Sequence, residues 1–197
     1  DYTYSYYGVG ADDGRVQYVT HLINGSAVRR DRFEYHSGTD AHGSAGDLKL
    51  VAVEQYDGGT WTELSRTYYR YYKLGDANGF EHGIKFAVEP EAYKRMQAAG
   101  LSPETATNAQ VAAYADYYFE YDNRKRVTVE KVYAGSQTYS FAYESSAFVN
   151  GMNNWKIKTT ETLPDGNKNI VFTNHVGQAM LKVFKAGSSK WFTFYKY

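Results

Sequence analysis

The stretch Tyr117–Tyr133, which reads YYFEYDNRKRVTVEKVY, predicts a β-hairpin. Aromatic residues alternate with other residues before the polar cluster at 122–125, and Val127, Val129 and Tyr133 resume the alternation after it. Because successive side chains of a strand point to opposite faces, a period of two places the aromatic rings on one face. The Asp and Asn that open the cluster are turn residues. The stretch is therefore interpreted as two strands joined by a tight turn.

Similar Tyr-rich stretches recur along the chain and predict an all-β protein. They are YTYSYY at 2–7, FEYH at 33–36, YYRYY at 68–72, YSFAYE at 139–144 and FTFYKY at 192–197. Turn signals such as Asp13-Gly14, Asn24-Gly25 and Asp165-Gly166 lie between them. We expect antiparallel Tyr-rich β-hairpins, side by side in one twisted sheet, forming a single domain over residues 1–197.

One interval, about residues 89–115, breaks the β pattern and predicts a short helical insertion near residues 90–114. Pro90 and Glu91 stand where a helix begins, good helix formers follow, and Gly100 comes after the last of them. A second short helix is expected after Asn108, which is interpreted as its N-cap. We expect this insertion to lie against the sheet or over its edge.

Composition limits the classes of partner. The chain has 197 residues, enough for one domain with its own core, and its apolar content includes 21 Tyr and 10 Phe. Tyrosine suits half-exposed sheet surfaces, so the core should be thin and sheet-like. With 22 basic and 22 acidic residues, the chain lacks the charge excess that recruits nucleic acid. The absence of cysteine excludes disulfides and thiolate metal sites, and no apolar run suggests membrane insertion.

The opening hairpin resembles the YD repeat, also called the Rhs repeat. The pattern of that family is Tyr-x-Tyr-Asp-x-x-Gly-Arg-Leu, followed later by a Gly and another Tyr-x-Tyr. The matching residues are Phe119, Tyr121, Asp122, Arg126, Val127, Gly135, Tyr139, Phe141 and Tyr143. Lys125 stands in place of the Gly, and because lysine is disfavoured at positive φ we expect a different turn after Asp122.

Further copies extend the resemblance to most of the chain except the helical interval. Tyr6 with Asp13, Gly14, Arg15 and Val16 is similar to a second, stretched copy. The segment 163–184 looks like a divergent one, of a kind found in very large bacterial surface proteins, planctomycete ones in particular. The resemblance implies a scaffold in which hairpins stack into a long spiralling sheet, and it implies no catalysis in the repeats.

Candidate sites have structural interpretations. Asp122 and Arg126 are interpreted as turn-stabilising, through hydrogen bonds or a cross-strand ion pair. Asp40 and His42, with His36 nearby, form the only cluster of metal-type ligands, and a solvated Gly/Ser loop is the preferred interpretation of it. The sequence contains no phosphate-binding loop and no nucleophile elbow. No catalytic residue, cofactor or metal is therefore expected.

The sequence favours a non-catalytic structural or assembly module of an extracellular or cell-surface protein. We expect it to be cut from a longer array, or to assemble end to end into a filament, tube or shell by strand addition between copies. A second hypothesis is a glycan-binding module that uses exposed Tyr and Trp, with Trp61 and Trp191 as the residues to test. The third is an enzyme that uses a metal in the loop of Asp40 and His42.

Overall fold

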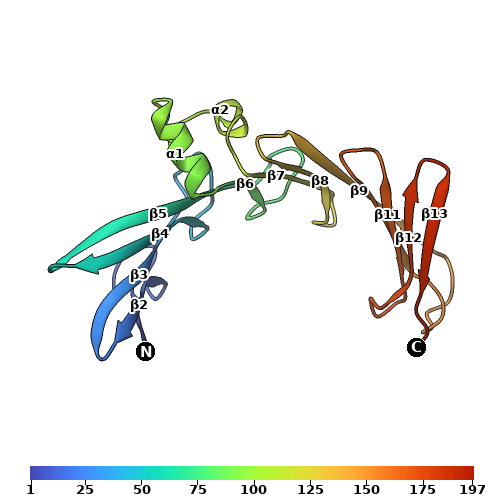
Figure 1. The fold of residues 1–197 in the computed structure, drawn as a ribbon, viewed down its shortest axis with the longest axis horizontal. Coiled ribbons are helices and arrows are strands. Elements are labelled where there is room, and N and C mark those ends of the chain that lie inside the picture. Colours follow the sequence, from blue (N-terminus) through green and yellow to red (C-terminus); the bar gives the residue numbers. More distant parts are fainter.

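The protein is one open β-sheet bent into an arch. The computed structural model describes all residues 1–197 and places 13 strands in sequence order from β1 to β13. Neighbouring strands are antiparallel throughout, so the chain is a meander. Figure 1 shows the arch, with the two chain ends at its two feet. The all-β fold of antiparallel hairpins is confirmed, and the sheet does not close on itself.

The strands vary in length from 5 residues in β1, β6 and β7 to 12 residues in β5. The first seven are β1 Tyr2–Tyr6, β2 Val16–Ile23, β3 Ser26–Tyr35, β4 Leu48–Asp57, β5 Thr60–Tyr71, β6 Ile84–Val88 and β7 Tyr117–Tyr121. The last six are β8 Val127–Val132, β9 Gln137–Ser145, β10 Ile157–Thr162, β11 Lys168–Thr173, β12 Ala179–Ala186 and β13 Ser189–Phe194.

The helical insertion connects β6 to β7, as the sequence predicts. Helix α1 spans Pro90–Ala98, with Pro90 in its first turn, and α2 spans Asn108–Ala112. The N-cap prediction was wrong by one residue. Thr107 is the N-cap, because its hydroxyl accepts from the Gln110 backbone N–H while the Gln110 side chain accepts from the Thr107 N–H.

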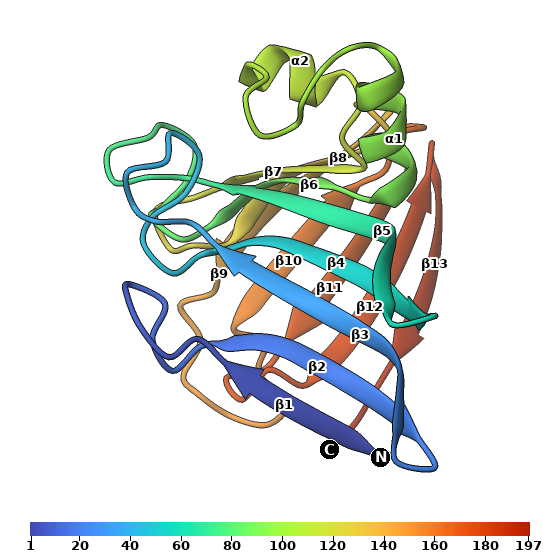
Figure 2. The ribbon, with the colours of Figure 1, turned by 90° about the vertical axis from the view of Figure 1, so that its left-hand side faces the viewer.

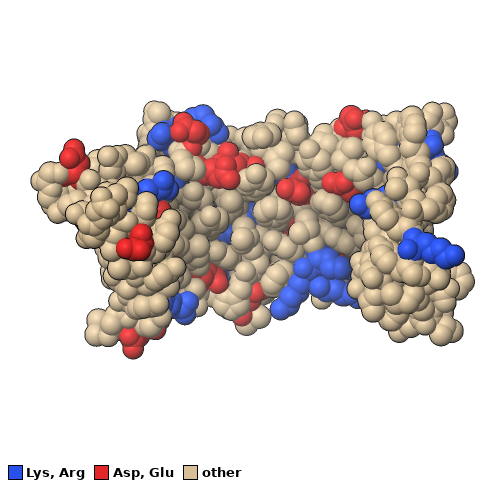
Figure 3. All heavy atoms as spheres, turned by 60° about the horizontal axis from the view of Figure 1, so that its bottom comes forward, with Lys and Arg blue, Asp and Glu red and all other residues tan.

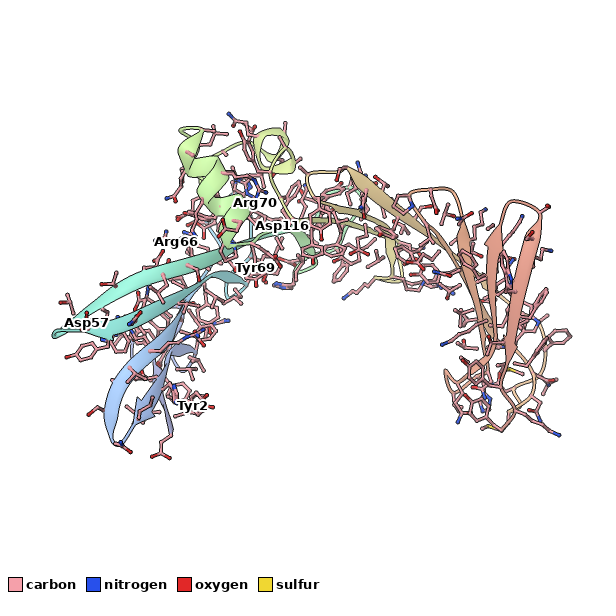
Figure 4. All side chains as sticks on the ribbon, viewed as in Figure 1. Tyr2, Asp57, Arg66, Tyr69, Arg70 and Asp116 are labelled. Atoms are coloured by element: carbon pink, nitrogen blue, oxygen red, sulfur yellow. The ribbon has the colours of Figure 1, made fainter.

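The helices lie on the outer, convex face of the arch (Figures 1 and 2). Because side chains alternate along β5, its aromatic residues lie either under the helices or on the concave face. Tyr68 and Arg70 point to the helices, whereas Tyr69 and Tyr71 point to the concave face, and Figure 4 shows Arg70 and Tyr69 on opposite sides of the sheet.

The core is thin, as the tyrosine content predicts, because only 24 of 197 residues are buried. The main apolar cluster lies between the helices and the sheet: Tyr68, Phe86, Val88, Ala92, Tyr93, Met96, Ala106, Val111 and Ala115. Outside this cluster only a few strand residues are buried, among them Leu50, Ala52 and Val183. Neither helix has the length and apolar character needed to cross a membrane.

Candidate functional site

The hairpin turn of residues 122–126 is held by Asp122. Its Oδ1 accepts from the backbone N–H groups of Arg124 (2.8 Å) and Arg126 (3.0 Å), and its Oδ2 accepts from Nε (2.8 Å) and Nη2 (2.6 Å) of Arg126. The hydrogen bond from the Arg126 side chain is the main reason why the pKa of Asp122 lies below its usual value. These are the turn-stabilising contacts that the sequence predicts for this pair.

The expectation that Lys125 changes the turn was wrong. Lys125 adopts φ 61°, the left-handed conformation that glycine favours, and its N–H donates to the Asp122 carbonyl (3.0 Å). The Asp122 N–H in turn donates to the Arg126 carbonyl (2.9 Å). Two sets of hydrogen bonds therefore keep Lys125 in the left-handed conformation. One set is accepted by the Asp122 side chain, and the other is the pair of backbone bonds that closes the turn.

The same closure recurs at five of the connections that lead from an odd-numbered to an even-numbered strand. In each, the first residue donates to the carbonyl of the last, and the last residue but one donates back to the first. The first and last residues are Tyr7 and Arg15, His36 and Asp47, Tyr72 and Gly83, Asp122 and Arg126, and Asn174 and Gln178. The last residue but one always has a positive φ: Gly14 76°, Gly46 86°, His82 72°, Lys125 61° and Gly177 84°. Loops of different length are thus closed by the same two backbone hydrogen bonds.

The stretched copy, Tyr6 with Asp13, Gly14, Arg15 and Val16, has this closure at Tyr7 and Arg15. Asp12, not Asp13, lies beside Arg15, with 3.6 Å between Oδ1 and Nε, and Asp13 is exposed. Arg15 also donates from Nη1 to the carbonyl of Gly46 (2.7 Å) in the next loop of this type. A Cβ on Gly46 would lie about 2 Å from that guanidinium, so the close approach requires glycine. Arg15 therefore joins two neighbouring hairpins.

Tyrosine hydroxyls connect neighbouring units. Tyr143 donates to the carbonyl of Val127 (2.8 Å) and lies under the guanidinium of Arg126, whose carbon is 4.1 Å from the ring centre. Tyr35 and Arg15 repeat this pairing, with Tyr35 donating to the carbonyl of Val16 (2.9 Å) and the Arg15 carbon 5.3 Å from its ring.

Three further hydroxyls act in similar ways. Tyr121 donates to the carbonyl of Ile84 (2.9 Å) on the neighbouring strand. Tyr7 and Tyr72 reach across an intervening strand to the carbonyls of Phe33 (2.9 Å) and Phe119 (2.7 Å). The sequence predicts where these tyrosines lie, but their acceptors depend on strand register and were not foreseen.

The remaining motif residues lie on the concave face or in turns. The rings of Tyr117 and Phe119 stack with 6.1 Å between their centres, and the register of β7, β8 and β9 places Tyr139 on the same face. Gly135, with φ 79°, lies in the turn from β8 to β9. Half-exposed aromatic rings therefore run across the middle of the concave face.

The loop of Asp40 and His42 does not assemble a metal site. Asp40 faces the buried His36, with Oδ2 3.1 Å from Nδ1, and His36 Nε2 lies 3.1 Å from the Tyr69 carbonyl. No group of three or more His, Cys, Asp or Glu side chains in the chain is placed to hold a metal ion. Burial and the nearby Arg70 guanidinium lower the pKa of His42 to about 4. His36 and Asp40 instead fasten the loop to β5.

Trp61 and Trp191 do not form one aromatic platform, because they lie on opposite faces of the sheet. Trp61 is on the convex face, 4.2 Å from the guanidinium carbon of Arg30. Trp191 is on the concave face, 55 % exposed, with its ring 5.5 Å from that of Phe184. Only Trp191 is free to stack on a ligand.

Sequence reasoning missed a charged cluster on the convex face. Glu54 accepts from Nε of Arg30 (2.5 Å) and Nε of Arg32 (2.9 Å), and Glu63 accepts from Arg32 and Arg66. Burial by itself raises the pKa of Glu54, but the hydrogen bonds from the two arginines outweigh it and leave the pKa lowered. The residues come from three strands, β3, β4 and β5. In the sequence, only the charged residues that alternate along β3 indicate such a cluster.

Both ends of the sheet present a strand with one unpaired edge. β1 pairs only with β2 and β13 only with β12, and every residue of these two strands is exposed. The underside of the arch combines broad uncharged areas with small groups of charged side chains (Figure 3). These open edges, with the aromatic concave face between them, are the candidate functional surfaces.

Comparison with known proteins assigns no family. No family model matches the chain, and a search of curated proteins finds no similar sequence.

Proposed function

We propose that the chain is a non-catalytic structural module of the YD-repeat type, belonging to an extracellular or cell-surface protein, whose sheet is extended at its edges by strand addition. The recurring turn closure is the observation that carries this proposal. The five odd-to-even connections, of three lengths, and the turn from Leu163 to Asn167 between β10 and β11 share one hydrogen-bond pattern and one left-handed residue, and tyrosines bind back to neighbouring strands. Such recurrence is expected of repeated units that are stabilised mainly by their neighbours.

The open edges support the assembly role. An edge strand offers unpaired N–H and C=O groups, and soluble proteins usually protect such edges with proline, charge, bulges or covering loops. β1 has no charged residue and no proline, and β13 has Lys190 as its single charge. The aromatic side chains of both strands are exposed, so an added strand would gain apolar burial as well as hydrogen bonds.

Sedimentation velocity over a concentration series tests this role. We expect species larger than the monomer at high concentration. A variant that combines Tyr4→Pro with Phe194→Pro should remain monomeric, because proline removes an outward N–H at each edge. Thr60→Ser, in β5 and away from both edge strands, is the control substitution. A wild-type chain that stays monomeric, or larger species that persist in the double variant, would count against assembly through the edges.

A specific observation favours glycan binding as a second candidate function. A groove of about 380 Å³ on the concave face is lined by Trp191, Phe184 and Lys182, together with Glu161 and Asn169. The Asn169 Nδ2 donates to Glu161 (2.8 Å), which fixes a carboxylate and an amide beside the rings. Aromatic faces with adjacent hydrogen-bonding groups suit sugar rings.

A glycan array, followed by titration of any ligand found, tests this candidate. Trp191→Ala should abolish binding, whereas Trp61→Ala, on the opposite face, should leave it unchanged. An array without hits, or equal binding by both variants, would remove the glycan hypothesis.

A further inference from the structure

A pocket of about 440 Å³ lies on the convex face, between the helical insertion and the sheet. Residues of β6, β7, β8 and β9 line it, together with α2 and the turn after β8, so the pocket is built from the middle of the chain. Figure 1 shows α2 above β6 and β7. A volume of this size suits a small molecule. The pocket is separate from the concave groove of Trp191 and from both edge strands.

The floor of the pocket is one row of side chains across four strands. Phe86 pairs with Tyr118, which pairs with Lys131, and Lys131 pairs with Thr138 on β9. Directly paired residues share a face of the sheet, and the rings of Phe86 and Tyr118 lie 4.9 Å apart between their centres. Small residues dominate the walls: Ala109, Ala112, Ala115 and Ala134. Two rings beside short side chains leave room for a flat apolar body.

A β-bulge turns Lys85 toward the same pocket. The pairing of β6 with β5 skips from Phe86 to Ile84, so Lys85 is an extra residue with no counterpart in β5. In a regular strand Lys85 would point to the face opposite Phe86, whereas a bulge redirects the side chain. Lys85 and Lys131 therefore both line the pocket, from the strands on either side of β7.

The ammonium groups of these two lysines form no ion pair. Lys85 Nζ lies 4.7 Å from the centre of the Tyr72 ring, and Lys131 Nζ lies 5.4 Å from that of Tyr118. Neither has a carboxylate within 4.0 Å, unlike three other lysines of the chain. Glu120, on the same face of β7, accepts from the Tyr118 hydroxyl (2.8 Å). The pocket thus carries two positive charges that no carboxylate neutralises.

Asn108 presents a hydrogen-bond donor to the pocket. Its Oδ1 accepts from Nη1 of Arg70 (2.7 Å), so its amide NH₂ group is the part left for a ligand. Arg70 is fully buried and donates to backbone carbonyls instead of a carboxylate, so it adds positive charge behind Asn108. Because lysine has no acceptor, the charged and amide groups of the pocket all act as donors. They favour a ligand group that is negatively charged and accepts hydrogen bonds.

The turn beside the pocket has an unusual backbone. Tyr133 and Ala134 both adopt left-handed conformations, with φ 51° and 56°, ahead of Gly135 with φ 79°. The Tyr133 N–H donates to the Asp116 carbonyl (3.0 Å) and the Ala134 N–H to the Ala115 carbonyl (2.8 Å), which ties the turn to the segment after α2. Left-handed residues other than glycine are costly and are concentrated at binding sites. Here they bring Ala134 and Gly135 to the pocket wall.

We propose that this pocket binds a small organic anion with a flat apolar body, of the class of aromatic carboxylates and sulfonates. The apolar body lies on the rings of Phe86 and Tyr118, and the anionic group lies between the ammonium groups of Lys85 and Lys131. β6 and β8 are two strand spacings apart, about 10 Å, so one anion can contact both lysine side chains. The proposal is independent of edge assembly and of glycan binding, which use other surfaces.

Two fluorescent probes test the site. 1-Anilinonaphthalene-8-sulfonate has a flat aromatic body with one negative charge, and N-phenyl-1-naphthylamine has the same body without the charge. The wild-type chain should bind the sulfonate. A variant that combines Lys85→Gln with Lys131→Gln should bind the sulfonate about tenfold or more weakly, because each lost hydrogen bond from a charged donor corresponds to roughly that factor. Its affinity for the uncharged probe should change by less than about twofold.

Lys168→Gln combined with Lys185→Gln is the matched control for the loss of two charges. These lysines pair with each other on β11 and β12, on the same face of the sheet but outside the pocket. The control should bind the sulfonate like the wild type. Ala112→Leu, which keeps both charges but occupies part of the pocket, should weaken both probes. Circular dichroism checks that each variant remains folded.

Amide NMR signals locate the bound sulfonate. Signals of α2 and of residues 134–135 should shift during the titration. Shifts confined to the concave strands, or equal weakening by the control, would place the probe elsewhere and overturn the proposal. A wild-type chain that does not bind the sulfonate, or an unchanged affinity in the variant of Lys85 and Lys131, would also overturn it.

Discussion

Replacement of Arg70 by methionine should detach the helical insertion from the sheet. Arg70 is fully buried in β5 and points to the insertion. Its Nη2 donates to the carbonyls of Pro103 (2.7 Å) and Ala106 (2.5 Å), and its Nη1 donates to Oδ1 of Asn108 (2.7 Å). No carboxylate contacts the guanidinium, and burial lowers the pKa of Arg70. The side chain thus holds the segment from Pro103 to Asn108 by hydrogen bonds and not by an ion pair.

The expected loss follows from which groups remain buried in Arg70→Met. Two backbone carbonyls lose their partner, and each unsatisfied buried acceptor costs roughly 1–3 kcal/mol. Asn108 is exposed, so its side chain can turn to water at little cost. Removal of the buried Arg70 charge, whose Nε has no partner, stabilises the variant and offsets part of this loss. We expect the free energy of unfolding to fall by about 2 kcal/mol, because the two carbonyls outweigh the relief of burial.

Urea unfolding and amide hydrogen exchange measure these two effects. Arg70→Met should lower the unfolding midpoint and accelerate exchange over residues 101–115, with less change in β9–β13. Arg95→Met is the matched control, since Arg95 is exposed on α1 and makes one long bond to the Tyr114 carbonyl (3.4 Å). A stability for Arg70→Met within about 0.5 kcal/mol of the wild type would refute the role of the buried guanidinium.

Two further predictions concern the turn of Lys125 and the loop of His42. Lys125→Gly should raise the free energy of unfolding in urea by about 0.5 kcal/mol. Glycine relieves a left-handed strain of roughly 1–2 kcal/mol. This gain exceeds the entropy cost of glycine and the loss of the contact between the Lys125 ammonium and the Phe80 ring, which are 4.9 Å apart. Gly177→Lys, at the same turn position, should destabilise, and a loss of stability in Lys125→Gly would contradict the strain. The His42 pKa of about 4 lies below the value in the unfolded chain, so stability should fall as pH drops from about 6.5 to about 4. Since His42 is partly exposed, the effect should be on the order of 1 kcal/mol or less, and His42→Gln should remove it when unfolding is compared at pH 7 and pH 4.

Local features of this fold could be predicted from the sequence because short-range chemistry determines them. Alternation of aromatic residues locates strands such as β7, and Asp122 with Arg126 forms the expected turn. The helical insertion is equally local, since proline and glycine mark its first helix. The error at Asn108 was small, because Thr107 and Asn108 are both good N-caps and only the Gln110 side chain decides between them.

Features that depend on strand register could not be predicted from the sequence. The ion cluster around Glu54 requires a bulge in the pairing of β4 and β5, which shifts Glu54 opposite Glu63. The separation of Trp61 from Trp191 follows from counting faces across the eight strand boundaries from β5 to β13, where each bulge changes the count. A pattern of alternation predicts which side chains share a face within one strand, but not across a sheet.

Tyrosine hydroxyls join neighbouring strands of this protein to one another. Away from the edges, the protein makes up for its thin core by joining strands through hydroxyl groups, as Tyr7 and Tyr72 do across an intervening strand. The three tyrosines of β1 have no such partner, and all three rings are more than half exposed. The hydroxyls of the interior tyrosines therefore tie strands together by hydrogen bonds where the thin core supplies little burial.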